Sequence, residues 1–310
     1  MYSLAPFNTL SQLVAAFPDE QSCIEHLEWL RWEGNVVSPY DPESKVYKCS
    51  GNRYKCSSTN KYFNVRTGTI FEGTKIPLKQ WFLAIYLFIS HKKGISSYQL
   101  AEDLGITQKS AWFLLSRIRY AMEHESFLKE MEGVVELDET FVGGKNKNRH
   151  WDKKVKNSQG RSFKDKTPVL GMLNKDGNVK CVVIPDTKPS SIQPIIRRQV
   201  KEGAIVVSDE WHAYKGLNDK YEHQVVDHGR AQYVNDNGFT TNSIEGFWSH
   251  FKKGLIGIYH NVVSRKHLQL YATEFSFRYN FRKNTANEKF NLFLNSVNGK
   301  RLTYNMLVHG

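Results

Sequence analysis

The 310-residue sequence predicts a mixed α/β protein, in which one sheet with helices on both faces follows helical and small β segments. Three observations predict this class. Residues 133–254 alternate apolar runs of strand length with helical segments, and residues 77–122 show the i, i+3, i+4 apolar spacing of helices. Residues 36–75 contain short alternating runs bounded by turn residues. With 40% apolar residues, the chain can bury the core of two domains, or of one domain with small modules.

The first part of the chain contains three predicted segments. Asp19 is a suitable N-cap for a short amphipathic helix over 19–32. Pro77 begins a longer helix, and two shorter helices follow on either side of Gly105, a residue suited to ending a helix. The segments are an N-terminal helical segment at 1–35, a small β module at 36–75 and a helical region at 76–125.

The helices around Gly105 have the layout of a helix-turn-helix, with the second helix as the candidate reader of DNA. An ordinary helical hairpin is the alternative. The candidate contacts to base edges or phosphates are Gln108, Lys109 and Ser110, and Arg117 and Arg119 could reach the DNA backbone.

Residues 126–283 are expected to form one α/β domain, and 284–310 remain an unassigned tail. Asp176-Gly177 signals a hairpin between the second and third strands. The element order suits a mixed five-stranded sheet with helices on both faces, as in ribonuclease-H-like folds. The predicted strands are 134–137, 168–174, 179–185, 204–208 and 224–227, and the predicted helices are 190–201, one near 211–217, 242–254 and 266–282.

Three acids have positions that suit a metal site. Asp138 ends the first predicted strand, Asp209 ends the fourth, and Glu245 lies on the helix over 242–254. Strand ends at one edge of an open sheet are where such folds gather ligands. Mg²⁺ prefers oxygen ligands, and two such ions can support an in-line phosphoryl displacement. Without a cation the clustered acids would repel one another, so the pattern predicts two bound Mg²⁺ or Mn²⁺ ions.

Spacing alone leaves alternatives open, since any single acid could be an ordinary surface residue. Glu136 lies on the same side of its strand as Asp138, and Glu139 and Glu210 adjoin the candidates. Lys252 follows Glu245 by seven residues, which is two helical turns, so its ammonium group could bind a phosphate near the metals.

The net charge of +12, from 43 Lys and Arg against 31 Asp and Glu, favours a phosphate polymer as partner. A solvated basic face is the alternative. Residues 145–166 carry nine Lys and Arg, and Lys145, Lys147 and Arg149 are candidates to contact a DNA backbone. No membrane span or signal peptide is evident, and four cysteines fit a reducing compartment, so a soluble intracellular protein without a membrane partner is expected.

Three long blocks resemble insertion-sequence transposases of the ISXO2-like group. The blocks are GTIFEGTKIPLKQWFLAIYLFISHKKGISSYQLAEDLGITQKSAWFLLSRIR, then ELDETFVGGK, then TNSIEGFWSHFKKGLIGIYHNV, and the likeness spans about residues 25–283. The resemblance implies an N-terminal zinc ribbon, a helix-turn-helix and a ribonuclease-H-like DDE catalytic domain. It implies catalytic roles for Asp138 of ELDET, rather than Glu136, and for Asp209, Glu245 and Lys252, with Asn242 a lesser candidate.

The chain departs from this family at the ribbon. Where two Cys-x-x-Cys pairs are expected, residues 38–41 read Ser-Pro-Tyr-Asp and residues 56–59 read Cys-Ser-Ser-Thr. Structural zinc normally needs four Cys or His ligands, so a degenerate ribbon without zinc is expected. Thr240 stands where many relatives are expected to have His.

The resemblance implies a transposase that binds terminal inverted repeats and uses Mg²⁺ to hydrolyse DNA and transfer strands. Such a protein would act as a homodimer or larger assembly on DNA, in a prokaryotic cytoplasm and associated with the nucleoid. Two alternatives are an inactive DNA-binding relic or repressor, and a structure-specific nuclease of the same fold.

Overall fold

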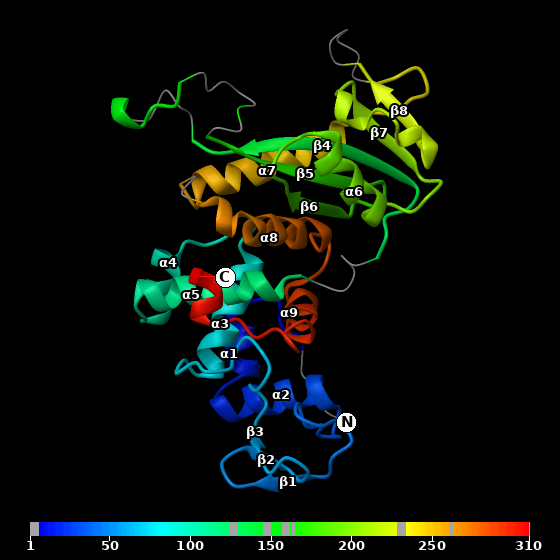
Figure 1. The fold of residues 1–310 in the computed structure, drawn as a ribbon. Coiled ribbons are helices and arrows are strands. Elements are labelled where there is room, and N and C mark those ends of the chain that lie inside the picture. Colours follow the sequence, from blue (N-terminus) through cyan, green and yellow to red (C-terminus); the bar gives the residue numbers. More distant parts are fainter. Residues whose placement is uncertain are drawn as a thin grey trace. The chain divides into compact units, whose positions relative to one another are not determined.

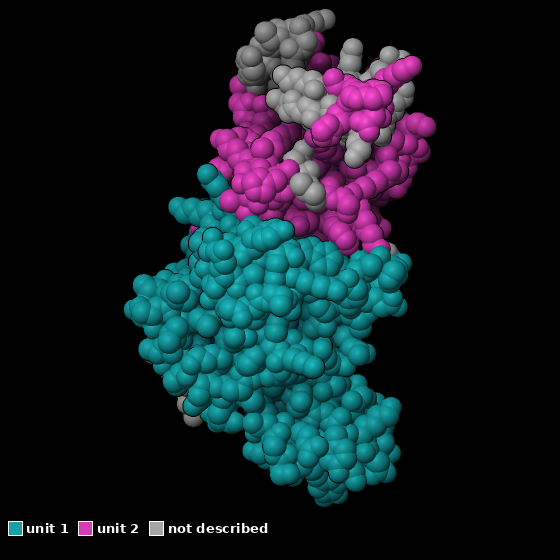
Figure 2. Space-filling model, turned by 90° about the vertical axis from the view of Figure 1, so that its left-hand side faces the viewer, with its two compact units in different colours: residues 1–123, 283–310 teal, residues 124–282 magenta. Residues whose placement is uncertain are grey.

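The computed structural model describes residues 6–123, 129–144, 150–156, 162, 165–227, 234–260 and 263–309. The chain forms two compact units, shown in different colours in Figure 2. Unit 1 comprises residues 1–123 and 283–310, and unit 2 comprises residues 124–282. Among the described residues, no helix combines the length and the apolar character that crossing a bilayer requires.

Unit 1 has an aromatic core built from segments far apart in the sequence. The rings of Phe17 and Phe82 meet edge to face at 4.9 Å, and Phe290 packs at 5.2 Å from both Phe7 and Phe82. Phe290 belongs to the segment that the sequence left unassigned. The helices are α1 (Leu10–Ala16), α2 (Glu20–Trp32), α3 (Leu78–Ser90), α4 (Ser97–Leu104), α5 (Gln108–Ala121), α9 (Ala286–Asn295) and α10 (Tyr304–His309) (Figure 1).

The β module of unit 1 is a three-stranded antiparallel sheet in the order β1-β2-β3 (Figure 1). Its side chains alternate between two faces because successive residues of a strand point to opposite sides. Tyr54 and Phe63 are buried on the inner face, which packs against Trp32 of α2, whereas Tyr47 and Tyr62 are exposed. The strands are β1 (Val46–Cys49), β2 (Arg53–Cys56) and β3 (Tyr62–Phe63).

Unit 2 contains a mixed five-stranded sheet in the order β6-β5-β4-β7-β8, so the predicted α/β class is confirmed. β4 pairs antiparallel with β5, and β5 pairs antiparallel with β6. β7 runs parallel to both β4 and β8. The strands are β4 (Val134–Val142), β5 (Thr167–Asn174), β6 (Val179–Val183), β7 (Ile205–Asp209) and β8 (Glu222–Val226).

Helices cover both faces of this sheet. α6 (Pro189–Gln199) packs through Ile192 and Ile196 on one face, and α7 (Asn242–Gly257) and α8 (Leu268–Asn280) cover the other (Figure 1). In place of the single helix expected near 211–217, two short 3₁₀ helices form. The 3₁₀ helices of the unit are η3 (Trp151–Lys153), η4 (His212–Tyr214), η5 (Leu217–Asp219) and η7 (Arg265–His267).

Candidate active site

Asp138 and Asp209 lie on neighbouring strands of unit 2, on the face that α7 covers. Val135 and Leu137 point into the core beneath α6, so alternation directs Asp138 to the opposite face. Glu136 of β4 is in register with Val207 of β7, and Asp138 and Asp209 each follow two residues later. Asp138 lies in the middle of β4 rather than at its end, because pairing with β5 extends the strand to Val142.

α7 brings two further predicted residues to Asp138. Glu245 and Lys252 lie seven residues apart on one face of the helix, with Trp248 between them. The side chains on this face and the adjoining part of β4 enclose a cavity of about 300 Å³. Its lining residues are Asp138, Glu139, Thr140, Glu245, Trp248, Ser249 and Lys252. Three of the four predicted catalytic residues therefore line one cavity.

The electrostatics tie the fourth residue to this cluster. Burial raises the pKa of Asp138 to about 6, and the negative charges of Asp209 and Glu245 raise it further. These acids are therefore close enough to Asp138 to oppose its ionisation. A divalent cation would remove that repulsion, so this donor set fits a hard cation with oxygen ligands.

The acids do not form a ready-made cage. Within the described ranges, no group of three or more His, Cys, Asp or Glu side chains has the arrangement of a metal site. Mg²⁺ retains several waters and needs only one or two carboxylates besides substrate phosphate, so a less enclosed set is compatible with it.

Glu136 has a different partner from Asp138, although both lie on the same face of β4. Its Oε2 accepts a hydrogen bond of 2.9 Å from the backbone N–H of Ile244, in the first turn of α7. Thr241, the N-cap residue, makes no side-chain capping hydrogen bond. Glu136 therefore caps the helix that carries Glu245 from a distant strand.

Three residues around the acids were missed by sequence reasoning. The Tyr214 hydroxyl is buried and donates a hydrogen bond of 2.5 Å to Glu139. Gly171 pairs with Asp138, and a Cβ at Gly171 would lie 2.5 Å from Trp248. An isolated glycine in an apolar strand signals close approach by another group, so this pair had a detectable signal.

The candidate DNA-reading residues of unit 1 lie at the start of α5, after a left-handed Gly105 with φ of 63°. Gln108 donates from Nε2 to Ser97 Oγ at 2.9 Å, and the Ser110 backbone N–H donates to the Thr107 hydroxyl. Lys109 is exposed, with its ammonium group 5.5 Å from the ring centre of Tyr304.

Arg117 and Arg119 are buried instead of facing a DNA backbone. They are 6% and 2% exposed. The Arg117 guanidinium donates to the carbonyls of Ile70 and Glu72, and that of Arg119 lies over the ring of Phe88. Both arginines stabilise the packing of α5, so neither guanidinium is available to a phosphate. The candidates Lys145, Lys147 and Arg149 lie outside the described residues.

The four ribbon positions lie in a hydrogen-bonded network. Ser38 Oγ accepts from the backbone N–H groups of Tyr40 and Asp41, and Ser58 Oγ donates to Asp41 Oδ2 at 2.6 Å. Cys56 Sγ lies 3.4 Å from Ser58 Oγ. Burial raises the pKa of the Cys56 thiol, but the surrounding hydroxyls lower it to about 6. Those hydroxyls belong to Ser38, Ser44, Ser58 and Thr59.

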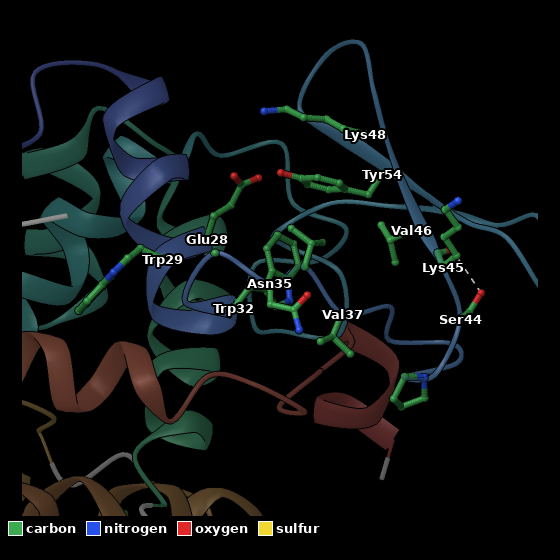
Figure 3. Close-up of a pocket in the computed structure, with 13 residues that line it drawn as sticks. Glu28, Trp29, Trp32, Asn35, Val37, Ser44, Lys45, Val46, Lys48 and Tyr54 are labelled. Carbon is green, nitrogen blue, oxygen red and sulfur yellow. Dashed lines mark hydrogen bonds between the residues drawn. The ribbon is translucent and has the colours of Figure 1, made fainter. Parts of the chain in front are cut away.

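A second cavity, of about 630 Å³, lies in unit 1 between α2 and the inner face of the β module (Figure 3). Trp32 and Tyr54 form part of its wall, and Lys48 reaches toward Tyr54 from β1 (Figure 3). Glu28 lies beside the Tyr54 hydroxyl, and burial raises the pKa of both groups, that of Tyr54 to about 12. This cavity contains none of the predicted catalytic residues.

Comparison with known proteins identifies the family. The model of the ISXO2-like transposase domain matches residues 130–280. A Halobacterium salinarum protein, described as an uncharacterized protein in transposable element ISH50, is 27% identical over 86% of this chain and 92% of its own length. A Haemophilus influenzae transposase-like protein is 31% identical over 33% of this chain and 80% of its own length.

The chain is also similar to a chain in the crystal structure of a pre-cleavage Mos1 transpososome. That likeness covers 67% of this chain and 79% of the other, at 12% identity and a TM-score of 0.21, which is too low to support an argument. The family model and the two sequence relatives rest on unit 2 and on most of the chain, respectively. This protein therefore belongs to the ISXO2-like transposase family.

Proposed function

We propose that this protein is a DDE transposase with a ribonuclease-H-like catalytic domain, which cuts DNA at the ends of its element and joins them to target DNA. One observation carries the proposal: Asp138, Glu245 and Lys252, from segments more than a hundred residues apart, line one cavity. The charge of Asp209 acts on Asp138 in the same place.

Asp138 and Asp209 would hold a divalent cation, Mg²⁺ or Mn²⁺, and Glu245 would complete a second cation position. When bound, such cations activate an attacking oxygen and stabilise the leaving one. Lys252, which is exposed at the cavity, would bind a backbone phosphate and orient the scissile bond. Asn242, the first residue of α7, would lie at the edge of the site.

The reaction would proceed in two displacements. In the first, the oxygen of water attacks phosphorus at the element end, and the 3′ oxygen leaves as a hydroxyl while the phosphate remains on the other strand end. In the second, that 3′-hydroxyl attacks a target phosphodiester, so one bond forms as another breaks.

DNA binding would use unit 1. α4 and α5, joined by three residues, have the spacing of a helix-turn-helix, in which the exposed Lys109 could contact DNA. The terminal inverted repeats of the element are the proposed specific partner. Since two ends must be joined, at least two copies of the chain are expected on the DNA, inside a prokaryotic cell.

The test is a cleavage and strand-transfer assay on a duplex that carries the element end, with Mg²⁺ or Mn²⁺. D138N, D209N and E245Q should each abolish both products, because each removes a cation ligand, while end binding persists. D152N, a change of an exposed acid, is the control. Undiminished strand transfer by D138N would overturn the assignment.

The same assay separates the alternatives. An inactive relic or repressor would bind the end and yield no cut product with any divalent cation. A structure-specific nuclease would release hydrolysed strands and form no joined product. Both outcomes leave the family membership unchanged and contradict the proposed activity.

A further inference from the structure

The exposed face of the small β module is strongly basic and contains no acid. Between Lys45 and Phe63 the chain has five Lys and Arg residues and neither Asp nor Glu. The register places Tyr47, Lys55 and Tyr62 side by side on three adjacent strands. Arg53 lies on the same face of β2, two residues from Lys55. We call Tyr47, Arg53, Lys55 and Tyr62 the outer face.

The two tyrosines of the outer face are exposed although nothing in the module requires them there. Tyr47 and Tyr62 are 47% and 54% exposed, whereas Tyr54 and Phe63 of the inner face form the core. Exposed aromatic side chains on a short sheet suggest a role in binding.

The tyrosine rings order the cations. The Arg53 guanidinium lies 5.5 Å and the Lys55 ammonium 6.0 Å from the ring centre of Tyr62. Lys45 lies 5.4 Å from that of Tyr47 at the margin of the face. Within the described chain none of these three cations has an ion-pair partner, so their charge is uncompensated. Cation–π contacts hold each cation in place without neutralising it.

We propose that the outer face binds the sugar-phosphate backbone of duplex DNA without sequence preference. Cations fixed on a rigid sheet can contact phosphates with little loss of side-chain entropy. Because both rings already hold cations, the face presents ordered charge rather than free stacking surfaces, which favours backbone over unstacked bases. The inference deepens the proposed function by naming a DNA contact outside α5.

The test measures binding of the full chain to a 30-base-pair duplex of arbitrary sequence, in EDTA so that no chemistry occurs. R53Q/K55Q removes two cations from the outer face, and K175Q/K188Q removes two exposed lysines from unit 2. For R53Q/K55Q, the slope of log K against log salt should fall by roughly 2, with at least about tenfold weaker binding at 0.15 M salt. K175Q/K188Q should bind as the wild type does.

A neutral pair of variants tests the ordering role of the ring. Y62L removes the ring beneath both cations and should weaken duplex binding several-fold without altering net charge. Y62F retains the ring and should bind as the wild type does. Circular dichroism and thermal melting establish that each variant is folded.

Three results would overturn the inference: R53Q/K55Q binding like the wild type, K175Q/K188Q losing as much affinity, or R53Q/K55Q losing affinity only for the single strand of the same sequence. These results leave the proposed function intact. Failure of the wild type to bind any duplex contradicts both, and loss of cleavage by a chain that still binds through the outer face contradicts the proposed function alone.

Discussion

Glu136 accepts a 2.9 Å hydrogen bond from the backbone N–H of Ile244, so an acid of the central strand caps the helix that carries Glu245. The carboxyl is 8% exposed, and burial raises its pKa while the hydrogen bond to Ile244 lowers it. Glu136 thereby fixes the start of α7 relative to β4, where Asp138 lies two residues further along.

Removing this cap should loosen α7. E136A leaves the Ile244 N–H without its acceptor, and should destabilise unit 2 by about 1–2 kcal/mol and lower strand transfer by displacing Glu245. E136Q retains an acceptor oxygen and should recover most of both losses. Thermal melting and the strand-transfer assay provide the measurements. Equal activity of E136A and wild type would show that the cap does not position Glu245.

The repulsion around Asp138 should be visible as a stability cost in the metal-free protein. The folded-state pKa of Asp138 is raised from 3.8 to about 6, so ionised Asp138 disfavours folding, and the cost grows as pH rises through that interval. D138N should therefore be more stable than wild type in EDTA, by at most about 3 kcal/mol at pH 7.5 and roughly half that at pH 5. Melting curves at both pH values measure this, with D152N as the control. A less stable D138N at pH 7.5 contradicts the prediction.

Cation binding should release a proton below neutral pH. With a pKa of about 6, Asp138 is largely protonated at pH 5.5 and must lose its proton to bind a cation. Mn²⁺ binding at pH 5.5 should release roughly 0.5–1 proton, and almost none at pH 8. Titration calorimetry in two buffers of different ionisation enthalpy measures the number. An affinity independent of pH between 5.5 and 8 would remove Asp138 from the cation site.

Close packing beneath Asp138 should make Gly171 intolerant of a side chain. A Cβ there would lie 2.5 Å from Trp248 and 2.9 Å from Ile244, so G171A must displace α7. The expected cost is about 1–3 kcal/mol, with lower strand transfer and unchanged duplex binding. G246A is the matched control, because a Cβ at Gly246 meets nothing within 4 Å. W248F should partly rescue G171A, and failure to do so would locate the strain elsewhere.

The ribbon network should accept zinc once its ligands are restored. S38C/D41C/T59C places three thiols around Cys56 with the spacing of two Cys-x-x-Cys pairs. This variant should bind one Co²⁺ with a tetrahedral thiolate spectrum and melt at a higher temperature with Zn²⁺. Adding C56S should weaken metal binding. Stoichiometric zinc in the purified wild type would contradict the expected absence of zinc.

The sequence by itself determined the elements whose signal is local. Alternation in residues 134–138 separated Val135 and Leu137 from Glu136 and Asp138, and helical spacing placed Lys252 on the face of Glu245. The capping box of Thr285 and Glu288 was an available signal for α9 that went unused. Such patterns are readable because hydrogen bonding along a helix or strand repeats with a fixed period.

Only the tertiary structure decided which like residues have which environment. Glu136 and Asp138 share a face, yet Glu136 caps α7 while Asp138 lines the cavity. Arg117 and Arg119 have the composition of DNA contacts, yet distant segments bury both. These outcomes depend on packing between segments far apart in the chain, and no local period encodes that packing.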